Sequence, residues 1–487
     1  MESLVIMAKN YGIVGPFTGL DLRRDAAMSD PASLRIASNV SLRVGGNLTR
    51  RDALVKLCDV SSETVGLYAS DNQLRVVCPG GQSLQDTRPS EIWYDVIGDG
   101  NSYPLGLLSK FHAVEHVSAA SGGKSYPYVV IERTDGRIEH HWLNGDPATS
   151  ATAVNTIVPL PFDPGKSLVK SQNKLFCDDP SAGVLRFSAS TTTPKDWTKA
   201  RDAGFLAVRN QSAGSRDIVA LSYFRSYVTV VFKDSIQLWQ MNPDPAKFEF
   251  INAFNGPGTE TPRLTTNVLG DMFYFNRGGF RSMARSSMNG DDLAEDIGAK
   301  IATLTSAQST AVTPVSWWSE SRSQYIAAFG TSVYVLTYSP SNDTTGWTTW
   351  TLPVSVDHWA ELDGVLYLRS GNTIYKFDPS VVNDTAGAVN FEVVPAFQAY
   401  GYPGRKKRWD SLDVVQTGAS QVNFLIDTTA PAVTELSAPI NIVNTTFPRG
   451  KIGINRTCDF LSLRFTGTAL WTLDSAILSA KVLGGVG

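Results

Sequence analysis

Few stretches of this sequence carry residues that could do chemistry at a recognisable spacing. One is Pro164-Gly165-Lys166-Ser167, which resembles the end of a phosphate-binding loop. Such a loop needs an earlier glycine so that its backbone can cradle the phosphates, and Leu160 lies in that region instead. We therefore interpret the segment as a turn.

Histidines form two small groups. His112, Glu115 and His116 could share one face of a helical turn, but no third ligand follows at metal spacing. His140 and His141 alternate across a predicted strand, so they cannot both face one metal from it. The sequence also has no Gly-x-Ser-x-Gly nucleophile elbow. We expect no metal, no cofactor and no enzymatic activity.

Two basic clusters stand out near the C-terminal end. The first is Arg405-Lys406-Lys407-Arg408, followed by Trp409, and the second contains Arg449, Lys451 and Arg456. The simplest interpretation of each is a solvated loop. Alternatively, a cluster near a symmetry axis is multiplied by the number of subunits and gives a ring of positive charge. Such a ring could contact DNA phosphates or an acidic partner, and Trp409 could anchor an interface.

Composition limits the classes of function. Lys plus Arg total 43 against 46 for Asp plus Glu, so a net charge of -3 argues against a protein whose main task is gripping nucleic acid. With 42% hydrophobic and 18% charged residues, the chain is expected to be folded. Its four cysteines lie far apart, and the N-terminal apolar run is too short for a signal peptide or membrane anchor. We expect assembly in the cytoplasm.

Seven β-hairpins are predicted between residues 65 and 377. Each shows a run of alternating apolar and polar residues, a polar or Gly-containing turn, and a second such run. The turns centre near residues 71, 135, 180, 234, 278, 331 and 371. A lone hairpin is marginal in water, and a spacing of about 50 residues is typical of the four-stranded blades of a β-propeller. We predict an all-β fold with a β-propeller, six-bladed if one hairpin lies outside the ring or shares a blade. Stacked β-sandwiches are the alternative.

The segments on either side of this repeat differ from it. Residues 1–60 are Gly-punctuated and are predicted to form an extended arm that packs on the C-terminal domain or on neighbouring subunits, and 61–382 the propeller. Residues 383–487 lose the hairpin pattern and are predicted to form a β-sandwich or channel-forming domain. A helix is predicted over Asp291–Leu304, from its acidic start and apolar spacing.

Propellers often host glycosidases, so we looked for their motifs. Residues 341–347 resemble the Asp-box of sialidase propellers, but the spacing from Asp343 to Gly346 is one residue too long. A solvent-exposed turn is favoured.

Two stretches resemble the tail nozzle proteins of short-tailed, podovirus-like bacteriophages. In the first, Ala37-Ser38-Asn39-Val40 precedes Gly45-Gly46 and the basic pair Arg50-Arg51. The second contains Ser235-Ile236-Gln237-Leu238-Trp239 and, further on, Gly278-Gly279 and Ile297-Gly298. These motifs are structural, and the family has no active site to carry over.

The resemblance implies a structural virion protein that stabilises packaged DNA. It would form a homohexamer in the virion tail, below the portal-adaptor protein, with genomic double-stranded DNA passing along its axis. Tail fibre or tailspike proteins and a needle or plug protein would be further partners. The two basic clusters are the expected contacts with the channel DNA or the adaptor. A glycan-binding or glycan-hydrolysing propeller is the alternative, and it predicts a working monomer.

Overall fold

The computed structural model describes most of the chain, with gaps. The described residues are 10–24, 29–59, 64–70, 73–77, 94–95, 108–118, 125–143, 155–190, 196–198, 202–211, 214, 217–289, 296–308, 313–399, 404–426, 435–448 and 451–483. Strands dominate them, so the predicted all-β class is confirmed.

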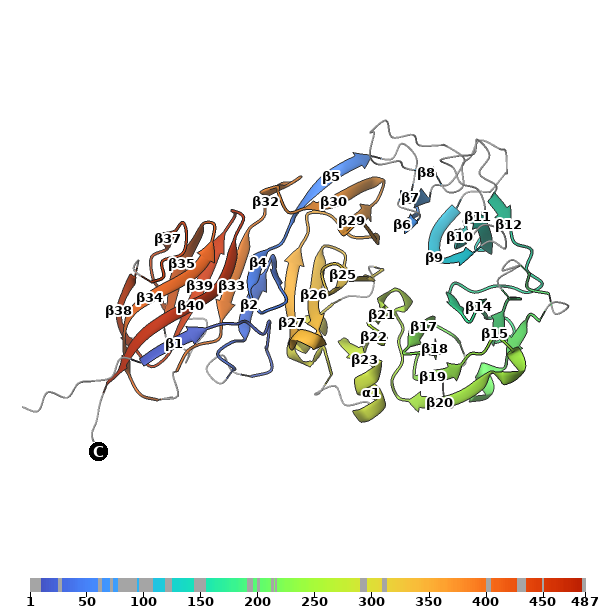
Figure 1. Ribbon diagram of the computed structural model, residues 1–487, viewed down its shortest axis with the longest axis horizontal. Coiled ribbons are helices and arrows are strands. Elements are labelled where there is room, and N and C mark those ends of the chain that lie inside the picture. Colours follow the sequence, from blue (N-terminus) through green and yellow to red (C-terminus); the bar gives the residue numbers. More distant parts are fainter. Residues whose placement is uncertain are drawn as a thin grey trace, which may run out of the picture.

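Small sheets, antiparallel except for the parallel pair β7/β8, follow one another around the larger part of the molecule (Figure 1). Three have four strands from consecutive sequence: β9–β12 (Leu108–Ser118, Ser125–Arg133, Ile138–Leu143, Asn155–Ile157), β13–β16 (Leu168–Ser171, Lys174–Asp179, Val184–Phe187, Gly204–Leu206) and β17–β20 (Ala220–Phe224, Tyr227–Val231, Ser235–Gln240, Glu249–Asn255). Two have three described strands: β6–β8 (Gly66–Ser70, Gln73–Val77, Tyr94–Asp95) and β21–β23 (Thr266–Val268, Asp271–Asn276, Gly279–Ser282).

Two further sets of strands pair with strands from other parts of the chain. Strands β24–β27 (Val315–Ser319, Gln324–Phe329, Ser332–Ser339, Thr344–Thr351) belong to a larger sheet that continues toward the C-terminal region. Strands β28–β30 (His358–Leu362, Val365–Ser370, Thr373–Asp378) are completed by β5 (Ala53–Asp59), which pairs antiparallel with β30. A strand from the start of the chain thus completes the last set.

Apolar cores join neighbouring sets in cyclic order. For example, Val169 and Phe176 of β13 and β14 pack in one cluster with Val228 and Val230 of β18. A further cluster joins the last set to the first, since it contains Leu67 of β6 and Tyr367 of β29. Contacts between the first strands close the same cycle, from β6 through β9, β13, β17, β21, β24 and β28 back to β6. We call this arrangement the ring.

All seven predicted hairpins are confirmed as antiparallel pairs: β6/β7, β10/β11, β14/β15, β18/β19, β22/β23, β25/β26 and β29/β30. The six-bladed count is not confirmed. It assumed that one hairpin lies outside the ring or shares a sheet with another, whereas each hairpin belongs to a separate set in the described residues.

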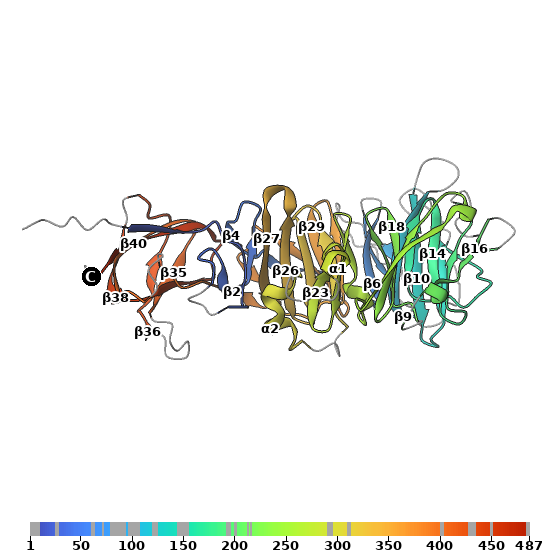
Figure 2. The same cartoon turned by 90° about the horizontal axis from the view of Figure 1, so that it is seen from below.

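The C-terminal region forms two packed sheets beside the ring (Figure 2). One carries β34 (Lys407–Thr417), β38 (Ile452–Cys458) and β40 (Thr472–Val482). The other carries β33 (Phe391–Pro395), β35 (Ser420–Ile426), β39 (Leu461–Gly467), and the short β36 (Glu435–Leu436) and β37 (Ile440–Ile442). Apolar residues of both, such as Leu412 and Phe424, share one core. A short hairpin, β31 (Asn383–Asp384) with β32 (Gly387–Ala388), precedes β33.

Strands from the N-terminal segment are built into both sheets. Strand β1 (Asn10–Val14) pairs with β40, and so does β4 (Leu48–Arg50), which also pairs with β3 (Val40–Leu42). Strand β2 (Leu34–Ser38) lies between β27 of the ring and β33. One sheet therefore runs without interruption from the ring into the C-terminal region, through a strand of the N-terminal segment.

Helical structure is sparse. The α-helices are α1 (Met283–Asn289) and α2 (Ala302–Thr305), and short 3₁₀ turns are η2 (Val208–Gln211), η3 (Pro245–Lys247), η4 (Pro262–Leu264), η6 (Ala299–Ile301) and η7 (Pro340–Asn342). In the part of the chain that the structure describes, no helix has the length and apolar character needed to cross a membrane.

The helix predicted over 291–304 is wrong for residues 296–301, which precede α2. Residues 291–295 lie outside the described residues, and 296–301 form turns and η6. The Gly298 main-chain N–H donates to the Phe280 carbonyl at 3.0 Å, and a Cβ at Gly298 would lie within 2.7 Å of Phe280 backbone atoms. Close packing on β23 overrides the helical pattern of the sequence.

Candidate functional site

The structure brings the two basic clusters together on neighbouring strands. Strands β34 and β38 pair antiparallel, with Arg408 opposite Thr457 and Trp409 opposite Arg456. Strand β38 is the outermost strand of its sheet. Of the predicted contact residues, Arg405, Lys406, Arg408, Lys451 and Arg456 are exposed. We call these five the basic edge; Arg449 lies outside the described residues.

A further lysine adjoins the basic edge. Lys481 of β40 is directly opposite Arg408, so both side chains extend from the same face of the sheet. Arg408 also forms an ion pair with Asp410, with 3.4 Å between Nε and Oδ1. Sequence analysis missed Lys481 because it stands alone among apolar and small residues.

Two residues of the first cluster point inward. Lys407 is fully buried, and its ammonium donates to the carbonyls of Arg405 and Asp459 at 2.8 Å each. Burial lowers the pKa of this lysine. Trp409 is equally buried and donates from Nε1 to the Cys458 carbonyl at 3.4 Å. The expectations that Lys407 contacts DNA or the adaptor and that Trp409 anchors an interface do not fit these positions, because alternation along β34 turns both side chains toward the core.

A second polar centre joins the ring, the N-terminal segment and the C-terminal sheets. Arg51, with 2% of its side chain exposed, forms a bidentate ion pair with Asp384, with nitrogen–oxygen distances of 2.9 and 2.5 Å. Arg51 Nε donates to Asn39 Oδ1 at 2.9 Å, and Nη2 donates to the Thr351 carbonyl at 3.1 Å. Asn39 adopts a left-handed backbone with φ of 54° and donates to the Asn390 carbonyl at 2.8 Å. We call this group the junction.

The adjacent arginine strengthens this connection. Arg50 donates to the carbonyls of Val381, Val382 and Thr468, which come from the segment after β30 and from the C-terminal end of β39. The residues that carry the family resemblance, Asn39 and Arg50-Arg51, thus meet in space although each binds a different part of the chain. Nothing in the sequence alone assigns a role to these residues.

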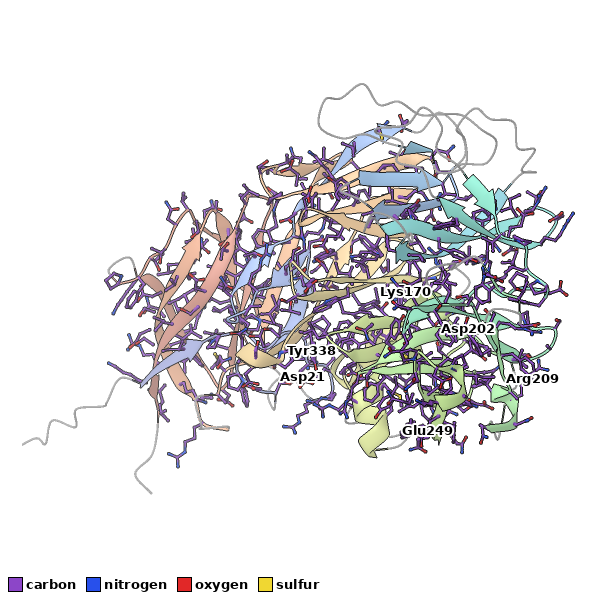
Figure 3. The ribbon with its side chains drawn as sticks, turned by 45° about the vertical axis from the view of Figure 1, so that its right-hand side comes forward. Asp21, Lys170, Asp202, Arg209, Glu249 and Tyr338 are labelled. Carbon is purple, nitrogen blue, oxygen red and sulfur yellow. The ribbon has the colours of Figure 1, made fainter. Side chains whose placement is uncertain are left out.

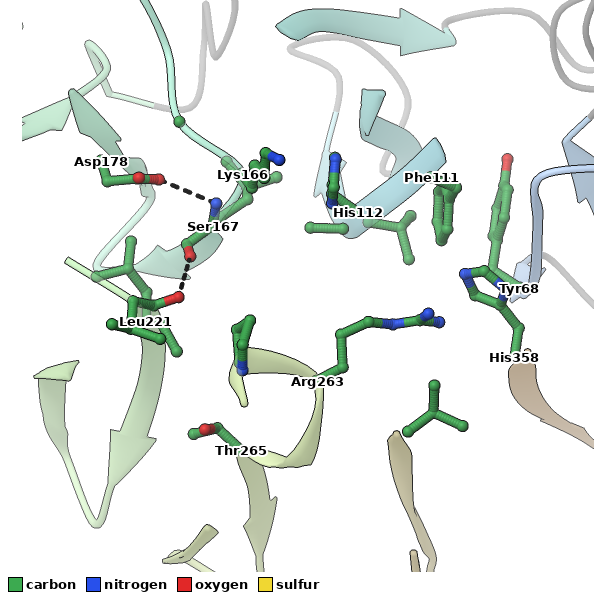
Figure 4. A pocket seen from close by; sticks show the side chains of 18 of the residues that line it. Tyr68, Phe111, His112, Lys166, Ser167, Asp178, Leu221, Arg263, Thr265 and His358 are labelled. Carbon is green, nitrogen blue, oxygen red and sulfur yellow. Dashed lines mark hydrogen bonds between the residues drawn. The ribbon is translucent and has the colours of Figure 1, made fainter. Parts of the chain in front are cut away.

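A cavity of about 740 Å³ lies at the centre of the ring. Residues just before the hairpins of successive sets line it, among them His112, Ser167, Leu221, Arg263 and His358 (Figure 4). The sequence interpretation of His112, Glu115 and His116 as a helical turn is wrong, because all three belong to strand β9. His112 Nε2 and Lys166 Nζ both contact Glu132 Oε2, at 2.8 and 3.0 Å.

Residues 164–167 form an irregular connection with a bend at Lys166 and not a regular turn. The main-chain N–H of Ser167 donates to the buried carboxylate of Asp178 at 2.9 Å, which Figure 4 shows as a dashed line. A Cβ at Gly165 would lie 1.8 Å from Asp178 Oδ2, so only glycine fits beside this carboxylate. Burial raises the pKa of Asp178 to about 6. The backbone amide is thus used to hold a side chain of the protein.

The two adjacent histidines of β11 have separate partners. His140 Nδ1 shares a hydrogen bond with the Tyr128 hydroxyl at 3.0 Å, and that hydroxyl accepts one from Trp197 Nε1 at 3.0 Å. His141 Nε2 lies 3.3 Å from Glu139 Oε2. Within the described ranges, no group of three or more His, Cys, Asp or Glu side chains is arranged to hold a metal ion.

The Asp-box-like segment is a turn, as predicted. Ser341, Asn342 and Asp343 are exposed between β26 and β27, and Asp343 has a left-handed backbone with φ of 49°. The following Trp347 is buried and donates from Nε1 to the Ile297 carbonyl at 2.7 Å.

A scan of the chain against protein-family models and a search of the curated proteins found no match. The functional interpretation therefore depends on the geometry described above and on the resemblance in the sequence.

Proposed function

We propose that this chain is the subunit of a homohexameric tail nozzle in the virion tail of a short-tailed bacteriophage. The assembly would be built in the host cytoplasm, dock below the portal-adaptor protein, retain packaged DNA and form the conduit for its ejection. It would act as a structural protein and not as an enzyme. Tail fibre or tailspike proteins and a needle or plug protein would attach to it.

We also propose that the ring is a β-propeller with seven blades, one for each hairpin. Apolar cores between neighbouring sets and the cyclic contacts of their first strands support this. In propellers, a strand from one end of the chain commonly completes the last blade, and β5 fits that part.

The observation that carries the functional proposal is the basic edge. Five exposed cationic residues from two sequence clusters meet on β34 and at the free edge of the C-terminal sheet, although the chain as a whole has a net charge of -3. Repeated around a six-fold axis, they would form a positive ring at one level of a channel. Few phosphate contacts per subunit would let DNA slide while holding it loosely.

The alternative of a glycan-hydrolysing propeller gains no support from the central cavity. Glycoside hydrolysis normally uses two carboxyl groups about 5–10 Å apart. Among the described residues that line the cavity, Asp178 carries the only carboxylate, and a backbone amide holds it.

Neutralising the basic edge tests the proposal. We expect the triple variant Arg405→Gln, Lys406→Gln, Arg408→Gln to fold as the wild type does, because these side chains are exposed. The yield of infectious particles in a phage complementation assay should fall by about tenfold or more, through weaker contact with DNA or the adaptor.

The control is Arg209→Gln, Lys233→Gln, Lys247→Gln, which removes the same charge from other surfaces of the ring. It should leave the yield unchanged. Unchanged particle yield and infectivity in the basic-edge variant would show that the basic edge has no role in the channel. Aggregation of that variant without loss of infectivity would instead show that the charges only protect the edge strand from pairing.

A further inference from the structure

The central cavity contains a guanidinium that no carboxylate neutralises. Arg263, on the short η4 turn, extends across the cavity toward His358 (Figure 4). Its Nη2 donates to the main-chain carbonyl of Asp357 at 2.6 Å. No carboxylate of the described residues forms an ion pair with Arg263, although its side chain is largely buried.

The nearest carboxylate is already engaged elsewhere. Asp357 Oδ2 lies 3.5 Å from Arg369 Nη2 and accepts the main-chain N–H of Gly371 at 2.8 Å. Two guanidinium groups thus share the neighbourhood of one carboxylate. Burial, and then the positive charge of Arg369, lower the pKa of Arg263 to about 10, so it stays cationic at neutral pH. An uncompensated buried cation is costly, and a bound anion would remove that cost.

Two polar rings, those of His358 and Trp359, belong to the lining of the same cavity. His358 is buried and accepts from Arg369 Nε at Nδ1, at 3.3 Å, which leaves its proton on Nε2. Both residues line the cavity, but His358 shares a hydrogen bond with the Phe111 backbone, and Trp359 Nε1 is buried away from the cavity surface. The group suited to an oxyanion is therefore the Arg263 guanidinium, since carboxylate and phosphate oxygens only accept hydrogen bonds.

The other charged groups of the cavity do not compete for this position. Lys166 forms an ion pair with Glu132, and burial lowers the pKa of His112, so this histidine is mostly neutral at neutral pH. Asp178, which would repel an anion, lies on the opposite side of the cavity from Arg263 (Figure 4).

We infer that the central cavity of the ring binds a small molecule through an oxyanionic group, a phosphate or a carboxylate, held by Arg263. The inference needs only the folded subunit, so it stands or falls independently of the homohexamer.

The test is calorimetric titration of the full-length chain with inorganic phosphate and, separately, with acetate, at constant ionic strength against chloride. We expect saturable binding of at least one of the two, and the stronger ligand identifies the group as phosphate or carboxylate. Arg263→Gln should weaken this binding by about tenfold or more, because a charge-assisted hydrogen bond is lost. Arg137→Gln, on an exposed hairpin turn, is the matched control and should bind as the wild type does.

Stability gives a second readout. In buffer free of oxyanions, Arg263→Gln should melt at or above the wild-type temperature, because it removes an unpaired buried cation. A clearly lower melting temperature would mean that Arg263 serves the fold, and it would overturn the inference. So would the absence of saturable binding by wild type, or equal binding by wild type and Arg263→Gln.

Discussion

Replacing Arg51 by Met is expected to lower the free energy of unfolding by about 3–5 kcal/mol, the usual cost of removing one partner from a buried ion pair. Methionine has a similar length but no charge, so Asp384 would remain buried with only the Leu54 main-chain N–H as donor. Asn39 Oδ1 and the Thr351 carbonyl would lose donors as well. The measurement is urea-induced unfolding followed by tryptophan fluorescence.

A matched control uses an ion pair on the same segment whose arginine is exposed. Arg23 bonds Asp21 at 2.7 Å, but 43% of its side chain is exposed, so Arg23→Met should change stability by about 1 kcal/mol or less. Adding Asp384→Leu to Arg51→Met should cost less than the sum of the two single changes, because the partners couple. If Arg51→Met and Arg23→Met have the same small effect, the junction does not hold the ring to the C-terminal sheets.

Replacing Glu115 by Gln is expected to stabilise the protein above neutral pH by about 3 kcal/mol. Burial raises the pKa of Glu115 from its ordinary 4.5 to about 7, and the Lys170 main-chain N–H, at 3.2 Å, only partly offsets this. Between these two values the folded state keeps a proton that the unfolded state has released, so stability falls as pH rises from about 4.5 to 7. Glutamine cannot ionise, so the penalty disappears.

The gain should therefore be absent at pH 4 and complete at pH 8, measured by denaturant unfolding across this range. Glu249→Gln is the control, because Glu249 is exposed on β20 at the outer rim of the ring (Figure 3). A stability difference for Glu115→Gln that is the same at every pH would contradict the burial of an ionisable Glu115.

The hairpins of the ring could be predicted from sequence because their information is local. In β18 and β19 the strand pattern and the polar turn at Lys233-Asp234 lie within a few residues of one another, although the structure buries side chains on both faces of these strands. The number of sets in the ring was not predictable in this way, because it depends on contacts between sets.

Long-range pairing left no comparable pattern. Nothing near Leu54 indicates that β5 pairs with β30 more than three hundred residues later, or that β2 lies between β27 and β33. Such pairings depend on which strand edges remain unpaired once the local sheets have formed. Arg51 shows the same limit, since an arginine in a polar segment gives no sign that it will be buried.

For the candidate site, the composition of the basic clusters identifies them in the sequence. Alternation along the strand could also have predicted which of their side chains are exposed. Period-two alternation already implies that Lys407 and Arg408 face opposite sides of a strand, and the structure buries the first and exposes the second. The cavity residues could have been found by aligning the seven hairpins and reading the residues before each, since Arg263 lies on the turn before β21 and His358 begins β28. Sequence analysis treated His112 and Lys166 singly and so did not bring them together.

The most direct test of the proposed nozzle is the mass of the purified full-length assembly by native mass spectrometry, alone and after mixing with an adaptor–portal complex. The proposal predicts an assembly of six 52.8 kDa chains, either in the free protein or formed on the adaptor. A monomer that stays monomeric and does not bind the adaptor would contradict it.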